Sequence, residues 1–282
     1  MKPVLVLQFA ERDPLGRLDG WLTDAGLTLE VRRADRGELP DSLDDYGGLV
    51  VLGGPMRAVD DAVHPWLAQV RALLRAAVAE DVPTLGICLG AQLLAASSGG
   101  RVGPLADGPE IGSGLIAKRT SAAADPLFRE LPIAPDVIQW HWDEITALPP
   151  GAIQLASSVV CENQAFRLGR LAWGLQGHIE TTPELVRGWA AATAAQLPEY
   201  DLDLVVERAV GVHDDLAEVW EPFARRFAGV VRDPDAVEAA NTVPTSTSAP
   251  LTDPAAIRAA LAAEAQAARA PGVFQIQPRR PQ

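Results

Sequence analysis

Residues 82–100 read VPTLGICLGAQLLAASSGG, and this stretch decides the fold class. A short apolar run ends at Cys88, and a helix-forming run with a glycine stop follows it. Gly86 and Gly90 bracket the cysteine. An apolar run without polar alternation is typical of a strand that is buried on both faces, as in a parallel sheet. The stretch therefore predicts a buried strand that turns sharply into a helix at Cys88.

The same strand-and-helix pattern occupies the whole first third of the chain. Apolar runs at 4–9, 27–31 and 47–55 are interpreted as strands, and helical patterns cover 15–26 and 64–81. Strands that alternate with helices predict an α/β fold with a parallel, doubly wound sheet.

The pattern changes after this α/β part. Residues 101–175 contain shorter β-rich segments, which we expect to extend the sheet with antiparallel strands. One domain is expected over 1–195, with a helical C-terminal extension over 196–230 packed on it through an apolar stripe. Residues 231–282 are expected to form a linker, an alanine-rich helix and a disordered tail.

Composition restricts the classes of partner. The 282 residues carry a formal net charge of −13 and no basic stripe of the kind that binds phosphate, so we expect no nucleic-acid partner. No apolar stretch reaches the roughly 18 residues of a membrane span, so no membrane association or targeting segment is expected. Two cysteines make no disulfide framework, and the expected location is a reducing cytoplasm.

Cys88 admits two interpretations. Most free cysteines are small buried hydrophobic residues. A cysteine between two glycines at a strand-to-helix junction is instead typical of a nucleophile held on a tight turn, where close neighbours must lack a Cβ. The start of the helix lowers the pKa of such a thiol, and its free N–H groups can bind an oxyanion. A cysteine nucleophile also needs a base, which is usually a histidine oriented by a carboxylate.

Among the four histidines, His178 fits the base best. It follows an apolar strand, and Glu180 lies two residues further on, so both side chains of an extended chain point the same way. Sites in open α/β sheets lie at the carboxyl ends of strands, where both Cys88 and His178 are expected. The alternative is a surface histidine at a strand end.

With these residues in this order, the sequence resembles the class I glutamine amidotransferase family, in its stand-alone and GMP-synthetase-like branch. The resemblance rests on GICLGAQLLA around Cys88, LQGHIETTPE around His178 and the loop in VVLGGPM. PEIG, QWHWDE and LASSVVCENQAFRLG add to it, and it covers about residues 3–190. The family usually has an aromatic residue before the histidine and a proline after it, where this chain has Gly177 and Ile179. These departures leave the three reactive residues intact but change the expected shape of the pocket.

The resemblance implies a flavodoxin-like fold and a γ-glutamyl amide substrate, most simply glutamine. Cys88 would attack the side-chain carbonyl and form a γ-glutamyl thioester, while the backbone N–H groups of Gly54 and Leu89 hold the oxyanion. His178 would protonate the leaving ammonia and then activate water, which releases glutamate. Glu180 would orient His178. No cofactor and no metal are expected.

Four further residues are candidates for the substrate side of the site. Gln92 lies one helical turn after Cys88, and the family uses the matching glutamine to contact substrate; the alternative is a glutamine on the helix surface. Gly53 is expected to shape the loop. His141 and Asp143 are expected to help bind the amino-acid end of the substrate, or else to form a hydrogen-bonded structural pair.

The other polar candidates receive local interpretations. Cys161 is interpreted as a buried thiol in a strand, His64 as a cap at a helix start, and His213 as a solvated helix residue. Glu110 lies either next to the site or in solvent.

Three functions remain open. The first is a glutamine amidotransferase that supplies ammonia to a separate synthetase chain, since the sequence contains no P-loop. The second is a γ-glutamyl peptidase or hydrolase with the same triad and water as acceptor; an open cleft, rather than a closed pocket, would favour it. The third is a non-catalytic regulatory or binding module, which the presence of all three triad residues disfavours. The resemblance to the synthetase-type branch favours the first.

Overall fold

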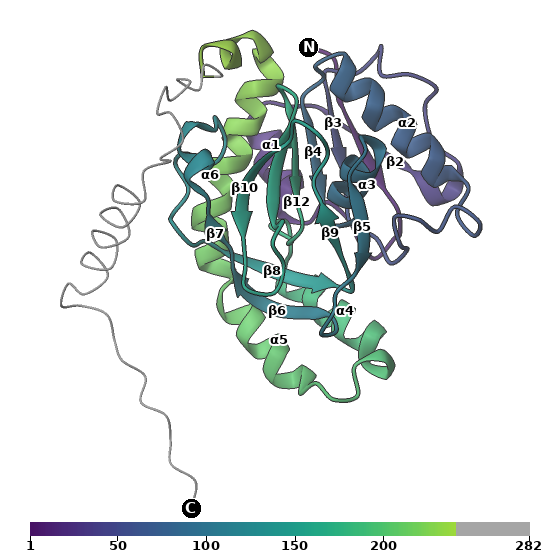
Figure 1. Ribbon diagram of the computed structural model, residues 1–282, viewed down its shortest axis with the longest axis vertical. Coiled ribbons are helices and arrows are strands. Elements are labelled where there is room, and N and C mark those ends of the chain that lie inside the picture. Colours follow the sequence, from purple (N-terminus) through teal and green to yellow (C-terminus); the bar gives the residue numbers. More distant parts are fainter. Residues whose placement is uncertain (241–282) are drawn as a thin grey trace, which may run out of the picture. The chain divides into compact units, whose positions relative to one another are not determined.

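The computed structural model describes residues 1–240 (Figure 1). Its strands are β1 (Val4–Gln8), β2 (Leu29–Arg33), β3 (Gly48–Val51), β4 (Thr84–Ile87), β5 (Arg101–Pro104), β6 (Glu110–Leu115), β7 (Ala117–Lys118), β8 (Asp136–His141), β9 (Asp143–Ala147), β10 (Ile153–Ser157), β11 (Ala165–Leu168) and β12 (Ala172–Leu175). Its α-helices are α1 (Arg17–Asp24), α2 (Trp66–Ala79), α3 (Leu89–Ser97), α4 (Pro183–Thr193), α5 (Leu202–Gly211) and α6 (His213–Arg232). Short 3₁₀ helices cover Ala34–Arg36, Thr120–Ala124, Ala194–Gln196 and Pro234–Ala240.

Eight strands form the central sheet in the order β2-β1-β3-β4-β12-β11-β10-β7. From β2 to β12 all neighbours are parallel, and β11, β10 and β7 continue in antiparallel pairs. The predicted flavodoxin-like fold, with a mostly parallel sheet and an antiparallel extension, is confirmed. Two predicted β-rich segments lie outside this sheet, because β5 pairs with β9 and β6 with β8 in separate two-stranded ladders.

The sheet separates two hydrophobic cores, as β1 illustrates. Val4 and Val6 belong to the core that α1 and α6 cover, and Leu5 and Leu7 to the core that α2 and α3 cover (Figure 1). Because successive side chains of a strand point to opposite faces, burial on both faces requires apolar residues at consecutive positions. This requirement explains the unbroken apolar runs of the sequence.

The C-terminal helices support the ladder of β6 and β8. α6 buries Trp220, Phe223 and Phe227, and the indole N–H of Trp220 donates to the backbone oxygen of Asp136 in β8 at 2.7 Å. α6 and the following 3₁₀ helix occupy the first ten residues of the stretch expected to begin the linker, 231–240. The expected alanine-rich helix and tail lie outside the described residues.

Two local predictions are wrong. His64 does not cap α2: the N-cap position is Pro65, and no side chain caps this helix. Cys161 is fully buried as predicted, but it lies in the connection between β10 and β11 rather than in a strand. Within residues 1–240, none of the helices is both long and apolar enough to cross a bilayer.

Candidate active site

The carboxyl ends of three adjacent parallel strands, β3, β4 and β12, meet at one point of the fold. Ile87 at the end of β4 pairs with Leu175 at the end of β12, so the residues that follow, Cys88 and Gln176, are neighbours. The backbone N–H of Cys88 donates to the oxygen of Leu175 at 2.8 Å. β3 leads into the loop that begins with Gly53. The register of the sheet therefore brings together segments that are about ninety residues apart.

The tight turn predicted at Cys88 is present. Cys88 is the N-cap residue of α3, with φ 50° and ψ −108°, a region that non-glycine residues rarely adopt. A Cβ on Gly90 would lie 2.0 Å from the backbone oxygen of Val51, and one on Gly86 would lie 2.7 Å from the carbonyl carbon of Gly90. The two glycines are therefore required because strand and helix backbones touch here.

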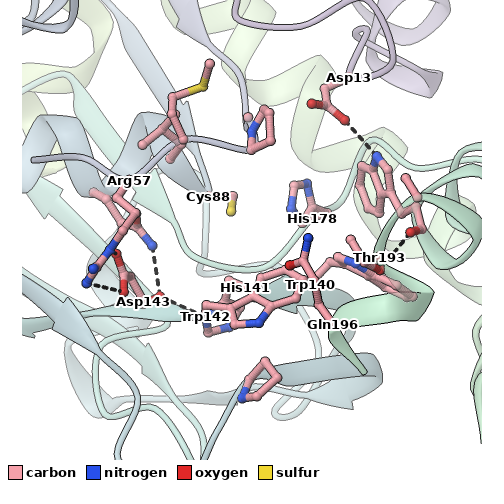
Figure 2. A pocket seen from close by; sticks show the side chains of 18 of the residues that line it. Asp13, Arg57, Cys88, Trp140, His141, Trp142, Asp143, His178, Thr193 and Gln196 are labelled. Carbon is pink, nitrogen blue, oxygen red and sulfur yellow. Dashed lines mark hydrogen bonds and ion pairs between the residues drawn. The ribbon is translucent and has the colours of Figure 1, made fainter. Parts of the chain in front are cut away.

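His178 is held from both sides. Its backbone N–H donates to Ile138 of β8 at 2.7 Å, and its backbone oxygen accepts from the same residue at 3.0 Å. Its Nδ1 lies 2.7 Å from Oε1 of Glu180, and both side chains are buried. The ring of Trp189, from α4, packs on the imidazole with 4.6 Å between ring centroids. The imidazole and the thiol of Cys88 line the same pocket (Figure 2).

The charges around His178 favour an imidazolium. Burial lowers the pKa of His178, but the charges of Glu180 and Cys88 outweigh it, so the pKa lies well above its ordinary value. An imidazolium next to a cysteine stabilises the thiolate, which is the nucleophilic form. The backbone of Glu180 is fixed as well, because its oxygen accepts the N–H of Arg17 at 2.7 Å.

Gly54 and Leu89, the expected oxyanion residues, lie beside Cys88. In the described part of the chain, neither backbone N–H donates a hydrogen bond to another protein group, and both residues line the pocket. Leu89 is the first residue of α3, where the helix leaves its N–H groups unpaired. A Cβ on Gly53 would lie 2.8 Å from Cε1 of His178 and 3.5 Å from Cβ of Cys88, so only glycine fits this position without displacement.

Gln92 is buried, so the alternative of a surface glutamine is wrong. Its Nε2 donates to the backbone oxygen of Asp143 at 2.9 Å and to Oε1 of Gln176 at 3.2 Å. Nε2 of Gln176 lies 3.8 Å from Sγ of Cys88 and donates to it. Gln176 was not predicted from the sequence. Its signal was its position two residues before His178, which puts both side chains on one side of an extended segment.

His141 and Asp143 do not pair side chain to side chain. Nδ1 of His141 contacts the backbone oxygen of Asp143 at 2.9 Å, and its Nε2 lies 3.1 Å from Glu110 and 3.0 Å from Gln139. The carboxylate of Asp143 accepts two hydrogen bonds from Arg57, at 2.8 and 3.0 Å. Glu110 is thus next to the site rather than in solvent. Arg57, which sequence reasoning also missed, carries a half-exposed guanidinium on the pocket wall.

His213 is not solvated as predicted. It is buried, its Nδ1 contacts the backbone oxygen of Ala209 at 2.6 Å, and its Nε2 lies 3.2 Å from Oγ1 of Thr181. Burial lowers the pKa of His213. Through Thr181 the start of α6 therefore contacts the residue that follows Glu180.

The glycine before His178 has a steric cause. A Cβ on Gly177 would lie 2.6 Å from Cγ2 of Val137, so Val137 of β8 occupies the space that a larger side chain at this position would need.

Comparison with known proteins identifies the family. Residues 18–187 match the family described as glutamine amidotransferase class-I. The chain belongs to this family. A structure of a glutamine amidotransferase from Thermotoga maritima superposes with a TM-score of 0.73 at 30% identity, over 80% of this chain and 98% of that one.

Two relatives of different description lie within reach of the sequence. Gamma-glutamyl peptidase 3 of Arabidopsis thaliana is 31% identical over 171 residues, which are 58% of this chain and 67% of that protein. A glutamine-hydrolysing GMP synthase subunit from Natronomonas pharaonis is 35% identical over 162 residues, which are 56% of this chain and 78% of that protein.

Proposed function

We propose that this protein cleaves γ-glutamyl amides, with Cys88 as nucleophile, His178 as general acid and base, and Glu180 as the carboxylate that orients His178. One observation carries the proposal: a cysteine on a positive-φ turn and a buried histidine–carboxylate pair line the same pocket. Membership of the class-I glutamine amidotransferase family, whose members are hydrolases and amidotransferases, supports it.

The reaction would proceed in two steps. The thiolate of Cys88 attacks the γ-carbonyl carbon, and the N–H groups of Gly54 and Leu89 stabilise the oxyanion, each by roughly 3 kcal/mol in the transition state. The C–N bond breaks as His178 gives its proton to the leaving nitrogen, which leaves a thioester on Cys88. His178 then takes a proton from water, the hydroxyl attacks the thioester, and glutamate leaves as the thiol is restored.

Glutamine is the simplest donor for this chemistry. With glutamine the leaving group is ammonia, and a synthetase in trans would be the acceptor. The relative from a GMP synthase of separate chains supports such a division of labour.

A second candidate is the hydrolysis of larger γ-glutamyl amides, with water as the final acceptor. The pocket has a volume of about 520 Å³, within the range that holds drug-sized ligands and more than glutamine alone fills. It extends past His178 to Thr193 and Gln196 at the end of α4, on the side where the amine leaves. The relative described as a γ-glutamyl peptidase supports this candidate.

The test compares the two cysteines. Release of glutamate is measured with L-glutamine and with γ-glutamyl-p-nitroanilide for the parent protein, Cys88→Ala and the matched control Cys161→Ala. We expect Cys88→Ala to lose at least about 10³-fold in kcat and Cys161→Ala to retain activity, because Cys161 is buried away from the pocket. Undiminished turnover by Cys88→Ala would exclude the mechanism. If neither amide is cleaved and no γ-glutamyl electrophile labels Cys88, the protein is a binding module.

A further inference from the structure

The pocket contains a second group of buried polar and aromatic side chains that the proposed reaction does not use. Asp13 follows β1, Trp140 lies near the end of β8, and Trp189 belongs to α4. Their exposed fractions are 8%, 7% and 7%, and all three line the pocket that also contains Cys88 and His178 (Figure 2). We call these three residues the acidic subsite.

Asp13 offers a free acceptor to a ligand. Its Oδ1 accepts the indole N–H of Trp189 at 2.7 Å, whereas the described residues give Oδ2 neither a hydrogen bond nor an ion pair. Figure 2 shows this second oxygen turned away from the indole. A buried carboxylate with an unpaired oxygen is costly unless a donor completes it. Burial raises the pKa of Asp13, although Trp189, His178 and the exposed Arg12 act in the opposite direction.

The aromatic side chains of the subsite also suit a cation. The rings of Trp140 and Trp189 lie 6.1 Å apart and tilted by 48°. Indole faces next to a carboxylate form the environment that binds ammonium groups through cation–π attraction and charge. In addition, the indole N–H of Trp140 is buried without a hydrogen-bond partner among the described residues. It is a free donor within the same pocket.

The position of the acidic subsite decides which part of a substrate enters it. In the proposed reaction His178 protonates the leaving nitrogen, so the leaving amine must lie against the imidazole. Trp189 packs on that imidazole, and Asp13 is bonded to Trp189. Arg57 and Asp13 lie on opposite sides of Cys88 (Figure 2), which leaves the guanidinium for the glutamyl part of the substrate.

We propose that the acidic subsite binds a second, positively charged amino group on the leaving amine, so that the substrate is a γ-glutamyl amide of a diamine or polyamine. The proposal rests on the proposed function of Cys88 and His178. The net reaction adds water across the amide bond and yields glutamate and the diamine, whose new N–H comes from His178. A neutral amine would leave Asp13 without a donor, and a leaving group that ends in a carboxylate would meet the like charge of Asp13.

The test uses three substrates that differ only at the end of a four-carbon amine. They are the γ-glutamyl amides of 1,4-diaminobutane, butylamine and 4-aminobutyrate, which end in a cation, a methyl group and an anion. kcat/KM is measured at pH 8 for the parent protein, for Asp13→Asn and for the control Asp19→Asn on the exposed face of α1. We expect the cationic amide to be preferred over the neutral one by about tenfold or more. Asp13→Asn should abolish this preference and leave the butylamide within about twofold.

Other outcomes overturn the proposal. An equal loss for all three amides in Asp13→Asn would mean that Asp13 serves the glutamyl group or only orders Trp189. Cleavage without preference in the parent protein would remove the cation subsite while leaving the proposed function intact. Failure to cleave any of the three, together with no labelling of Cys88, would remove both. Free 1,4-diaminobutane gives a second measurement: it should inhibit the parent protein more strongly than butylamine does, and equally weakly in Asp13→Asn.

Discussion

The side-chain amide of Gln176 donates to the sulfur of Cys88, with 3.8 Å between Nε2 and Sγ. Gln92 sets the orientation of that amide, because its own Nε2 donates to Oε1 of Gln176 at 3.2 Å. A hydrogen bond to a charged group favours that charged form and so lowers the pKa of an acid such as a thiol. Gln176 therefore acts on the same atom that His178 is proposed to activate, from a different direction.

Replacing Gln176 by leucine removes this donor. We expect the pH midpoint for alkylation of Cys88 by iodoacetamide to rise by about one unit, and kcat/KM at neutral pH to fall by about tenfold. The control is Gln164→Leu, another buried glutamine, whose amide donates to Glu110 and Ser158 instead. An unchanged midpoint for Gln176→Leu, or an equal rise for Gln164→Leu, would show that the contact does not act on the thiol.

Replacing Glu180 by glutamine removes the carboxylate next to His178. Burial then opposes only the charge of Cys88, so the pKa of His178 falls from its raised value. At pH 7 the imidazolium is depleted, the thiolate loses its partner, and activity should drop by about 10²–10⁴-fold. Alkylation of Cys88 should slow at pH 7 and recover toward the ordinary thiol pKa of about 8.5. The measurement is the pH profile of alkylation, with the exposed Glu184→Gln as control; superimposable profiles would disprove the role of Glu180.

Adding one methyl group at Gly53 should disturb the imidazole. The new Cβ would lie 2.8 Å from Cε1 of His178, so the ring must shift, and displacements of this kind cost about 10²-fold in rate. Gly20→Ala is the control, since nothing lies within 4 Å of its Cβ in the middle of α1. Steady-state kinetics of both variants, combined with thermal melts, test the prediction. Full activity in a folded Gly53→Ala protein would contradict the arrangement of this loop.

Gly177→Ala should destabilise the fold through overlap with Val137. The added Cβ would lie 2.6 Å from Cγ2 of Val137, and overpacking of this kind costs about 1–3 kcal/mol in the free energy of unfolding. Because the two side chains share one space, the double variant with Val137→Ala should recover part of the loss. Urea denaturation of both single variants and the double variant measures this coupling, and strictly additive losses would refute it.

Much of the site was predictable because it depends on short-range patterns. The apolar runs identified the buried strands, and the paired glycines marked the turn at Cys88. The spacing of His178 and Glu180 along one extended segment put their side chains on one side. Each of these signals lies within a few residues of the group it concerns.

The rest could not be predicted because it depends on packing between distant elements. Asp13 and Trp189 are 176 residues apart in the chain and meet only when α4 covers the end of β1. His213 resembled a solvated helix residue because two aspartates follow it, and only its contact with Thr181 shows that it points inward. The exposure of a helical histidine depends on what covers the helix, which local sequence does not state.

The most direct test of the central claim is to map the site of covalent labelling by a γ-glutamyl electrophile, 6-diazo-5-oxo-L-norleucine, with mass spectrometry. Our account predicts one adduct, on Cys88, in the parent protein and in Cys161→Ala. It also predicts that the adduct forms far more slowly in His178→Ala, and that an excess of a γ-glutamyl amide substrate slows its formation. An adduct on Cys161, or an unlabelled Cys88 in a protein that still releases glutamate, would contradict the account.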